Sequence, residues 1–232
     1  MNLYFLVEGA STERKLYPAW LNHLIPSLTR VYIPADAQVN NYYLVSGGGQ
    51  PQLLDIRLSN SVDDIVETGR FDYFVIVLDA EDVSVQERKK EVEDRVDVFR
   101  DKLALCKVQI IIQNKCIESW ALGNRHIFSR NPPTRDLAQH IQFFNVFHND
   151  PELMEKPDAY DSSVASYHYD YLRALLNAKN IRYTKKYPRD VKKPYYLDYL
   201  CERVQNFPLH LQSFQLFLNF CNLLNQQIES DF

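Results

Sequence analysis

Cysteine is scarce in this sequence of 232 residues and does not occur in a metal-binding pattern. The four cysteines form no C-x-x-C pair and show no spacing typical of a zinc site: they are Cys106, Cys116, Cys201 and Cys221. This usage argues against a cysteine-ligated zinc centre. It fits a protein that works in a reducing compartment.

Long apolar runs are also missing. Residues 1–7 are apolar for only a few positions and carry no basic leader, so they predict a first strand rather than a signal peptide. No stretch approaches the roughly 18 apolar residues that a membrane span needs. We therefore expect a cytoplasmic protein.

An excess of positive charge is absent as well. The net charge is −4, so the molecule as a whole is not a polycation that coats nucleic acid. The segment Ser46-Gly-Gly-Gly-Gln50 lacks the G-K-[ST] ending of a P-loop and gives no support to ATP binding. It is either a plain turn or a loop whose N–H groups approach a phosphate. The six histidines are scattered and form no catalytic spacing, and we expect His168 to be a packed surface residue.

What is present in the first half is an alternation of strand and helix patterns. The residues predict strands at 3–7, 42–45, 73–78 and 108–112, and helices beginning near Thr12, Ser61 and Ser84. Strand 73–78 is apolar throughout, as expected for a parallel strand covered on both faces. We therefore predict an α/β fold with a mostly parallel central sheet flanked by helices.

The second half has a different character. After Pro133 the apolar and aromatic residues fall at helical spacing, interrupted by prolines, so we expect a helical C-terminal region. Within it, residues 182–196 combine basic residues with Tyr: Lys185, Lys186, Arg189, Lys192 and Lys193 lie in this run. Basic side chains bind phosphates and aromatic faces stack on unpaired bases, so the run is either a nucleic-acid contact or a solvated loop.

Acidic residues follow two of the best strands. Glu8 comes directly after the first strand, and Asp79, Glu81 and Asp82 follow the strand at 73–78. Ligands of open parallel sheets bind beyond the carboxyl ends of the strands, and gathered carboxylates repel one another unless a cation lies between them. Oxygen ligands without His or Cys suit Mg²⁺ or Mn²⁺, which activate water and bind phosphate oxygens. Alternatively, each acid caps a helix.

These motifs also support a resemblance to a known family. Val7-Glu8-Gly9 followed by Thr12-Glu13, and the acidic group at 79–82 after an apolar strand, resemble the Toprim fold of topoisomerases, primases and OLD-type nucleases. Residues 7–21 are similar to small Toprim-like effectors of prokaryotic antiphage systems, including those carried by retrons. Three further stretches fit that group: 46–49, 77–82 and 117–120.

The resemblance implies a division of the chain and a set of site residues. It covers residues 1–125 as a Toprim-like metal-binding core, with residues 126–232 as the helical region. It implies that Glu8, Asp79 and Glu81 are catalytic and hold Mg²⁺ or Mn²⁺ together with Asp82, with Glu13 and Glu118 as outer acids. Glu81 stands where the family pattern has Asp, a change that also fits a non-catalytic relative.

The function implied is a divalent-metal-dependent endonuclease of antiphage defence, acting on RNA such as tRNA or on DNA. In that interpretation the basic residues at 185–193 hold the nucleic-acid backbone, and a regulatory protein, retron or ATPase is the partner. Two alternatives remain open. One is a non-catalytic Toprim-fold sensor or partner protein of a defence complex, and the other is a phosphatase or phosphotransferase acting on a small substrate.

Overall fold

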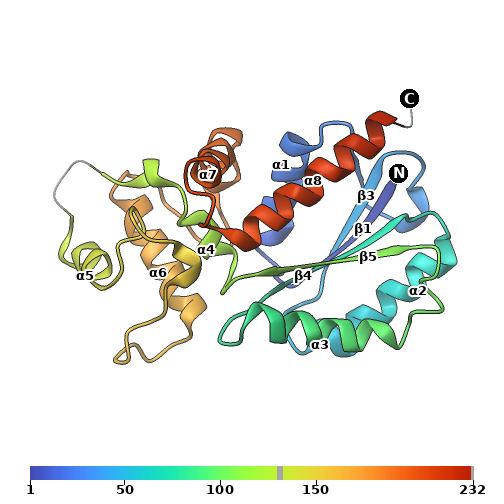
Figure 1. The fold of residues 1–232 in the computed structure, drawn as a ribbon, viewed down its shortest axis with the longest axis horizontal. Helices are drawn as coiled ribbons and strands as arrows, with labels where there is room; N and C mark the ends of the chain where they lie inside the picture. Colours follow the sequence, from blue (N-terminus) through green and yellow to red (C-terminus); the bar gives the residue numbers. More distant parts are fainter. Residues whose placement is uncertain (130–132, 231–232) are drawn as a thin grey trace. The chain divides into compact units, whose positions relative to one another are not determined.

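The chain forms an α/β fold around one five-stranded, all-parallel sheet, as the sequence predicted (Figure 1). The computed structural model describes residues 1–129 and 133–230. The strand order is β2-β3-β1-β4-β5. The strands are β1 Asn2–Val7, β2 Thr29–Val31, β3 Asn41–Ser46, β4 Tyr73–Asp79 and β5 Lys107–Gln113. The predicted strands are thus confirmed, and the short edge strand β2 is added to them.

The central strand β1 is apolar because helices cover both of its faces. Every residue of β1 is buried, and the strand pairs in parallel with β3 and with β4. Phe5 meets the ring of Tyr17 on α1 (Glu13–Leu24) at 6.4 Å. Its neighbour Tyr4 donates a hydrogen bond to Asp64 on α2 (Leu58–Thr68) at 2.7 Å. Since successive strand side chains point to opposite faces, α1 and α2 cover opposite faces of the sheet.

This arrangement makes the end of β1 the point where chain connections diverge. The connection after β1 runs to the face that carries α1 and α8 (Gln212–Ser230). The connections after β3 and β4 run to the other face, where α2 and α3 (Val85–Asp97) lie (Figure 1). In open parallel sheets, ligands bind at such a switch point, beyond the carboxyl ends of the strands.

The chain forms two compact units, which we call unit 1 and unit 2. Unit 1 holds residues 1–78, 85–112 and 217–232, and unit 2 holds residues 79–84 and 113–216. Unit 2 contains α4 Ile117–Ala121, α5 Arg135–Phe143, α6 Val164–Asn177 and α7 Pro194–Asn206. Short helical turns complete the fold at Pro34–Asp36, Leu53–Arg57, Arg125–Ile127, Pro151–Leu153 and Arg189–Lys192. The domain boundary near residue 125 stays a prediction.

Two local expectations were wrong. Ser61 does not begin a helix, because α2 already starts at Leu58 and buries Ser61 inside it, although the helix does end at Gly69 in a left-handed conformation (φ 61°). His168 is not a surface residue, because its side chain is 0% exposed within α6. Among the described helices, none is long and apolar enough to cross a membrane.

Candidate acidic site at the carboxyl ends of the strands

Glu8 is held by its backbone at the end of β1. Its N–H donates to the carbonyl of Val77 on β4 at 3.0 Å, which extends the ladder between the two strands by one residue. Its carbonyl accepts from Gly49 N–H at 3.1 Å and from the Ser46 hydroxyl at 3.4 Å. The side chain is half-buried. The backbone of Glu8 is therefore fixed between β4 and the glycine loop that follows β3.

The loop at 46–49 is hydrogen-bonded to the backbone at the end of β1. The N–H groups of its three glycines are all bonded internally: Gly47 to the Val7 carbonyl, Gly48 to the Ser46 hydroxyl and Gly49 to the Glu8 carbonyl. Gly48 and Gly49 have φ values of 82° and 91°, in the left-handed region that glycine adopts without strain. The geometry therefore favours the turn over the alternative in which these N–H groups bind a phosphate.

Glu13 lies against the turn at Glu8 and Gly9, which follows β1. It is buried at the start of α1, and its carboxylate accepts a hydrogen bond from Gly9 N–H at 3.1 Å. A Cβ atom added to Gly9 would come within 1.8 Å of Glu13 Oε2. Gly9 is therefore a glycine because the Glu13 carboxylate occupies the space of a side chain. The structure gives Glu13 a local role, which is to fix the Glu8-Gly9 turn.

The second acidic group lies in unit 2. Asp79 is the last residue of β4 and is half-buried, whereas Glu81 and Asp82 are exposed in the turn that follows. The N–H of Glu81 donates to the Lys115 carbonyl at 2.9 Å, which ties this turn to the end of β5. Glu81 has a φ of 52°, a conformation that costs a non-glycine residue on the order of 1–3 kcal/mol.

Glu118 is enclosed in the interior of unit 2. It lies in α4, is 1% exposed, and accepts a hydrogen bond from the Tyr183 hydroxyl at 3.0 Å. Burial, followed by the charge of Glu118, raises the pKa of Tyr183 well above its ordinary value. Burial also raises the pKa of the Cys116 thiol, and the carboxylates of Glu118 and Asp79 raise it further. Cys116 is therefore a neutral thiol near Glu118 and Asp79, and Tyr183 is a neutral phenol beside Glu118.

The predicted acids are thus distributed over the two units. Unit 1 holds Glu8 and Glu13, and unit 2 holds Asp79, Glu81, Asp82 and Glu118. Within residues 1–129 and 133–230, no group of three or more His, Cys, Asp or Glu side chains is arranged to hold a metal ion. Carboxylate oxygens are ligands that suit Mg²⁺ or Mn²⁺, and Glu8 and Asp79 each supply one carboxylate, Glu8 directly after β1 and Asp79 as the last residue of β4. The metal site itself stays a prediction.

The predicted basic residues all lie exposed on one segment of unit 2. They are Lys185, Lys186, Arg189, Lys192 and Lys193. Lys186 and Arg189 lie over the ring of Tyr187, at 5.7 and 6.0 Å from its centroid, and Tyr187 is 54% exposed. Tyr183, at the start of the same segment, is the buried residue that bonds Glu118. The segment therefore exposes basic side chains and an aromatic ring to solvent, while Tyr183 at its start is held in the interior by Glu118.

Sequence reasoning missed a buried polar network in unit 2. Glu152 is 3% exposed and accepts from Ser213 N–H, from the Ser213 hydroxyl at 2.6 Å and from Phe214 N–H, which caps the start of α8. The same Ser213 hydroxyl accepts from the indole of Trp120 at 2.7 Å. Burial raises the pKa of Glu152 to about 7. An acid two residues after Asp150 carries no recognisable sequence signal, because its partner lies about sixty positions away.

A second part of this interior is built around His168. Its Nε2 lies 2.9 Å from the Met154 carbonyl, so it carries the proton, and its Nδ1 accepts from the Ser119 hydroxyl at 2.8 Å. Burial lowers the pKa of His168 to about 4, so the ring stays neutral. Ser119 is also 0% exposed. The pair has no access to a substrate, and we assign it a structural role.

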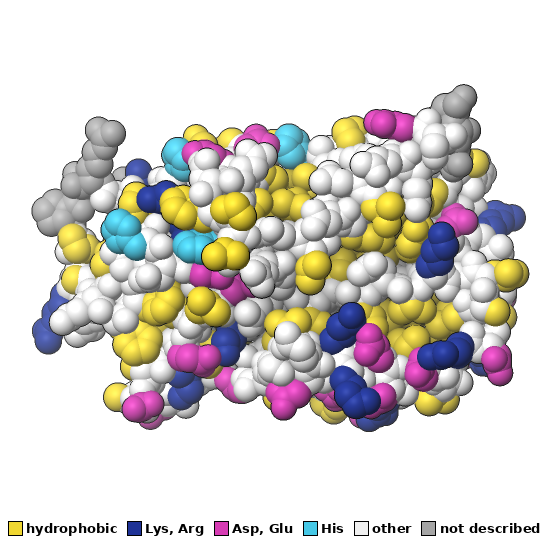
Figure 2. All heavy atoms as spheres, in the orientation of Figure 1, with side chains coloured by type: hydrophobic (Ala, Val, Ile, Leu, Met, Phe, Trp, Pro, Cys, Tyr) yellow, Lys and Arg dark blue, Asp and Glu magenta, His cyan; other side chains and the backbone are white. Residues whose placement is uncertain are grey.

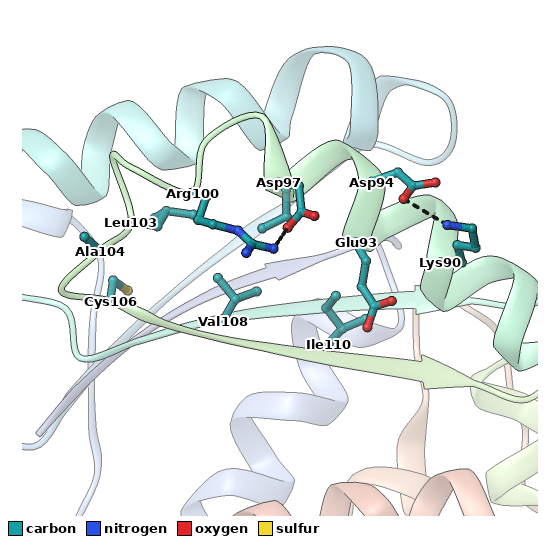
Figure 3. Close-up of a pocket in the computed structure, with 11 residues that line it drawn as sticks. Lys90, Glu93, Asp94, Asp97, Arg100, Leu103, Ala104, Cys106, Val108 and Ile110 are labelled. Atoms are coloured by element: carbon teal, nitrogen blue, oxygen red, sulfur yellow. Dashed lines mark hydrogen bonds and ion pairs between the residues drawn. The ribbon is translucent and has the colours of Figure 1, made fainter.

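The surface of unit 1 contains a pocket that is separate from the predicted site residues. It has a volume of about 660 Å³ and is lined by α3, the turn that follows it and β5 (Figure 3). Val108 and Ile110 provide apolar lining, and Lys90–Asp94 and Arg100–Asp97 are ion pairs at its rim. Figure 2 shows basic and acidic side chains intermixed along the part of the surface where α3 lies. Helix α3 therefore carries charges of both signs on its solvent-facing side.

Comparisons with known proteins identified no relative of this chain. No family model, no curated protein and no solved structure matches the chain. The fold is therefore described on its own geometry.

Proposed function

We propose that this chain is a divalent-metal-dependent endonuclease of the Toprim-like kind, acting on RNA such as tRNA or on DNA in antiphage defence. The observation that carries the proposal is the position of the acids on the sheet. Glu8 follows β1 and Asp79 ends β4, and these strands are parallel neighbours in the centre of one sheet. Because β1 is the switch point of the topology, this edge is where ligands of such sheets bind.

The carboxylates of Glu8, Asp79, Glu81 and Asp82 would hold the metal in this proposal. A bound Mg²⁺ or Mn²⁺ supplies charge stabilisation at phosphate oxygens and lowers the pKa of water. The chain contributes the positions of the ligands. The backbone hydrogen bonds of Glu8 fix the first acid, and the Gly9–Glu13 contact fixes the turn that follows it. The hydrogen bond from Glu81 N–H to the Lys115 carbonyl fixes the second acidic turn.

The exposed basic segment of unit 2 supports nucleic acid as the substrate class. Lysine and arginine contacts to phosphates supply most non-specific affinity, and an exposed Tyr adds a stacking surface for unpaired bases. Tyr187 lies under two of these cations, so charge and stacking occur at one place. Because the protein as a whole has a net charge of −4, the positive charge of this segment is a local feature and not a property of the whole surface.

The test combines cleavage and metal binding. Purified wild type is incubated with tRNA and with plasmid DNA in Mg²⁺, in Mn²⁺ and in EDTA, beside Asp79→Ala and the exposed-acid control Asp101→Ala. The proposal expects metal-dependent cleavage by wild type and Asp101→Ala and none by Asp79→Ala. It also expects Mg²⁺ to raise the melting temperature of wild type but not of Asp79→Ala. If neither cleavage nor a metal-dependent shift occurs in wild type, the proposal is wrong.

A specific observation favours a second candidate, a non-catalytic sensor or partner protein of a defence complex. No three acids are gathered in the described residues, and the position that carries Asp in the family holds an exposed Glu81 here. This candidate expects no melting shift with Mg²⁺ and copurification of a partner protein. The melting experiment therefore separates the two candidates even if cleavage requires an activating partner.

A further inference from the structure

Two arginines of unit 2 lie on the same aromatic ring. The guanidinium carbon of Arg125 is 4.8 Å from the centroid of Phe207, and that of Arg203 is 5.2 Å from it. Arg125 also lies 4.1 Å from the ring centroid of Phe147 and is therefore bounded by two aromatic rings. Like charges this close repel, and the charge of Arg125 lowers the pKa of Arg203, after the larger effect of burial.

No carboxylate neutralises either guanidinium by a direct ion pair in the part of the chain that the structure describes. Arg203 is 2% exposed and donates to three neutral carbonyls, those of Val146, Phe147 and Asn149, at 3.3, 3.2 and 2.9 Å. It also donates to His210 Nδ1 at 3.1 Å. Arg203 is therefore a clamp on the loop that carries Phe147, and its hydrogen bonds are used within the protein.

Arg125 differs from Arg203 in having hydrogen-bonding capacity left over. Its side chain is half-buried, and its Nε is buried without a hydrogen-bond acceptor. Asp150, whose charge acts on Arg203, and Glu202, which lies beside His126, both contact other groups. Asp150 accepts from the N–H groups of Leu211 and Glu152, and Glu202 pairs with His126 at 3.3 Å. A buried guanidinium N–H without a partner is costly. Because the Arg125 residue is only partly buried while its Nε is fully buried, we expect an external anion to be bound by the terminal guanidinium N–H groups, which donate to no protein acceptor within the described residues.

We propose that Arg125 binds a phosphate group of a nucleotide chain. Arg203 is the positioning residue: it holds the backbone of Phe147, whose ring lies against Arg125, and it adds a second positive charge. A guanidinium matches phosphate geometry with paired N–H donors, and flanking rings keep its plane fixed. Next to it, the exposed His126 ring stacks on Tyr199 with centroids 3.8 Å apart. Figure 2 shows His, basic, acidic and hydrophobic side chains together in the region of α7.

This inference rests on the proposed function for its choice of a nucleotide chain, but its test involves no cleavage. Binding is measured in EDTA by anisotropy of a fluorescent single-stranded RNA octamer, with and without a 5′-phosphate. Inorganic phosphate alone is added in a parallel melting experiment. The variants are Arg125→Gln and Arg125→Lys, with Arg135→Gln, an exposed arginine on α5, as the matched control.

We expect Arg125→Gln to weaken RNA binding by about tenfold or more, the loss of one charge-assisted contact. Arg125→Lys should fall between it and wild type, and Arg135→Gln should bind like wild type. Preference for the 5′-phosphate identifies a terminal phosphate, equal binding identifies an internal phosphodiester, and stabilisation by inorganic phosphate alone identifies a free anion. Equal affinities of Arg125→Gln and wild type, equal losses in both glutamine variants, or no binding by wild type to any of these ligands would overturn the inference.

Discussion

Replacing Gly9 by Ala tests how tightly the turn behind Glu8 is built. The added Cβ would lie 1.8, 2.3 and 2.4 Å from the three terminal atoms of the Glu13 side chain, so the carboxylate as a whole must move. It then loses its hydrogen bond from Gly9 N–H, and a bond to a charged group contributes about 1.5–3 kcal/mol. We expect the free energy of unfolding of Gly9→Ala, measured with urea at pH 7, to fall by about that amount.

A double-mutant cycle makes the reasoning refutable. In a Glu13→Ala background the methyl group has room, so Gly9→Ala should then cost less than about 0.5 kcal/mol, which is a coupling within the range seen for contacting residues. The exposed neighbour Ala10→Ser serves as control and should change stability by no more than about 0.5 kcal/mol. If Gly9→Ala costs the same in both backgrounds, Glu13 does not occupy the space beside Gly9 and this account of the turn is wrong.

Three further predictions concern unit 2. Because the folded pKa of Glu152 is about 7, above its ordinary 4.5, the folded state holds its proton more tightly, and the free energy of unfolding of wild type, measured with urea, should fall by about 3 kcal/mol as pH rises from 4.5 through 7. Glu152→Gln should flatten this pH profile, and an unchanged profile in the variant contradicts the assignment. Tyr183→Phe should lower the unfolding free energy by about 1–3 kcal/mol because buried Glu118 loses its donor, whereas the double variant with Glu118→Leu should recover part of the loss. Replacing Lys185 and Lys186 by Gln should reduce the salt dependence of single-stranded RNA binding by a slope of about 0.7 per lost phosphate contact, and an unchanged slope removes them from the interface.

The sheet was predictable because its signals are local. Strand β4 is a run of apolar residues followed at once by an acid, and helix α1 has its apolar residues at a spacing of three and four. By contrast, β2 has three residues, none of them buried, so no alternation marks it. Its pairing with β3 alone makes it a strand. The start of α2 was missed because Ser61 resembles a capping residue but packs inside the helix.

The sequence predicted where the acidic residues lie along the chain, but not which groups they contact. The sequence places Glu8 and Asp79 after strands, and the parallel pairing of β1 with β4 makes those strands neighbours. The roles of Glu13 and Glu118 depend on partners that no spacing reveals, a glycine N–H in one case and Tyr183 in the other. His168 was misplaced for the same reason, since the residues that bury it are distant in sequence.

The central claim is that Glu8 and Asp79 hold one divalent cation. The most direct measurement is anomalous diffraction from a crystal soaked in Mn²⁺. The account predicts a peak whose centre lies about 2.0–2.6 Å from carboxylate oxygens of both Glu8 and Asp79, the range of hard-cation ligand distances in proteins. A soaked crystal with no peak at these residues, or with manganese bound only elsewhere, would contradict it.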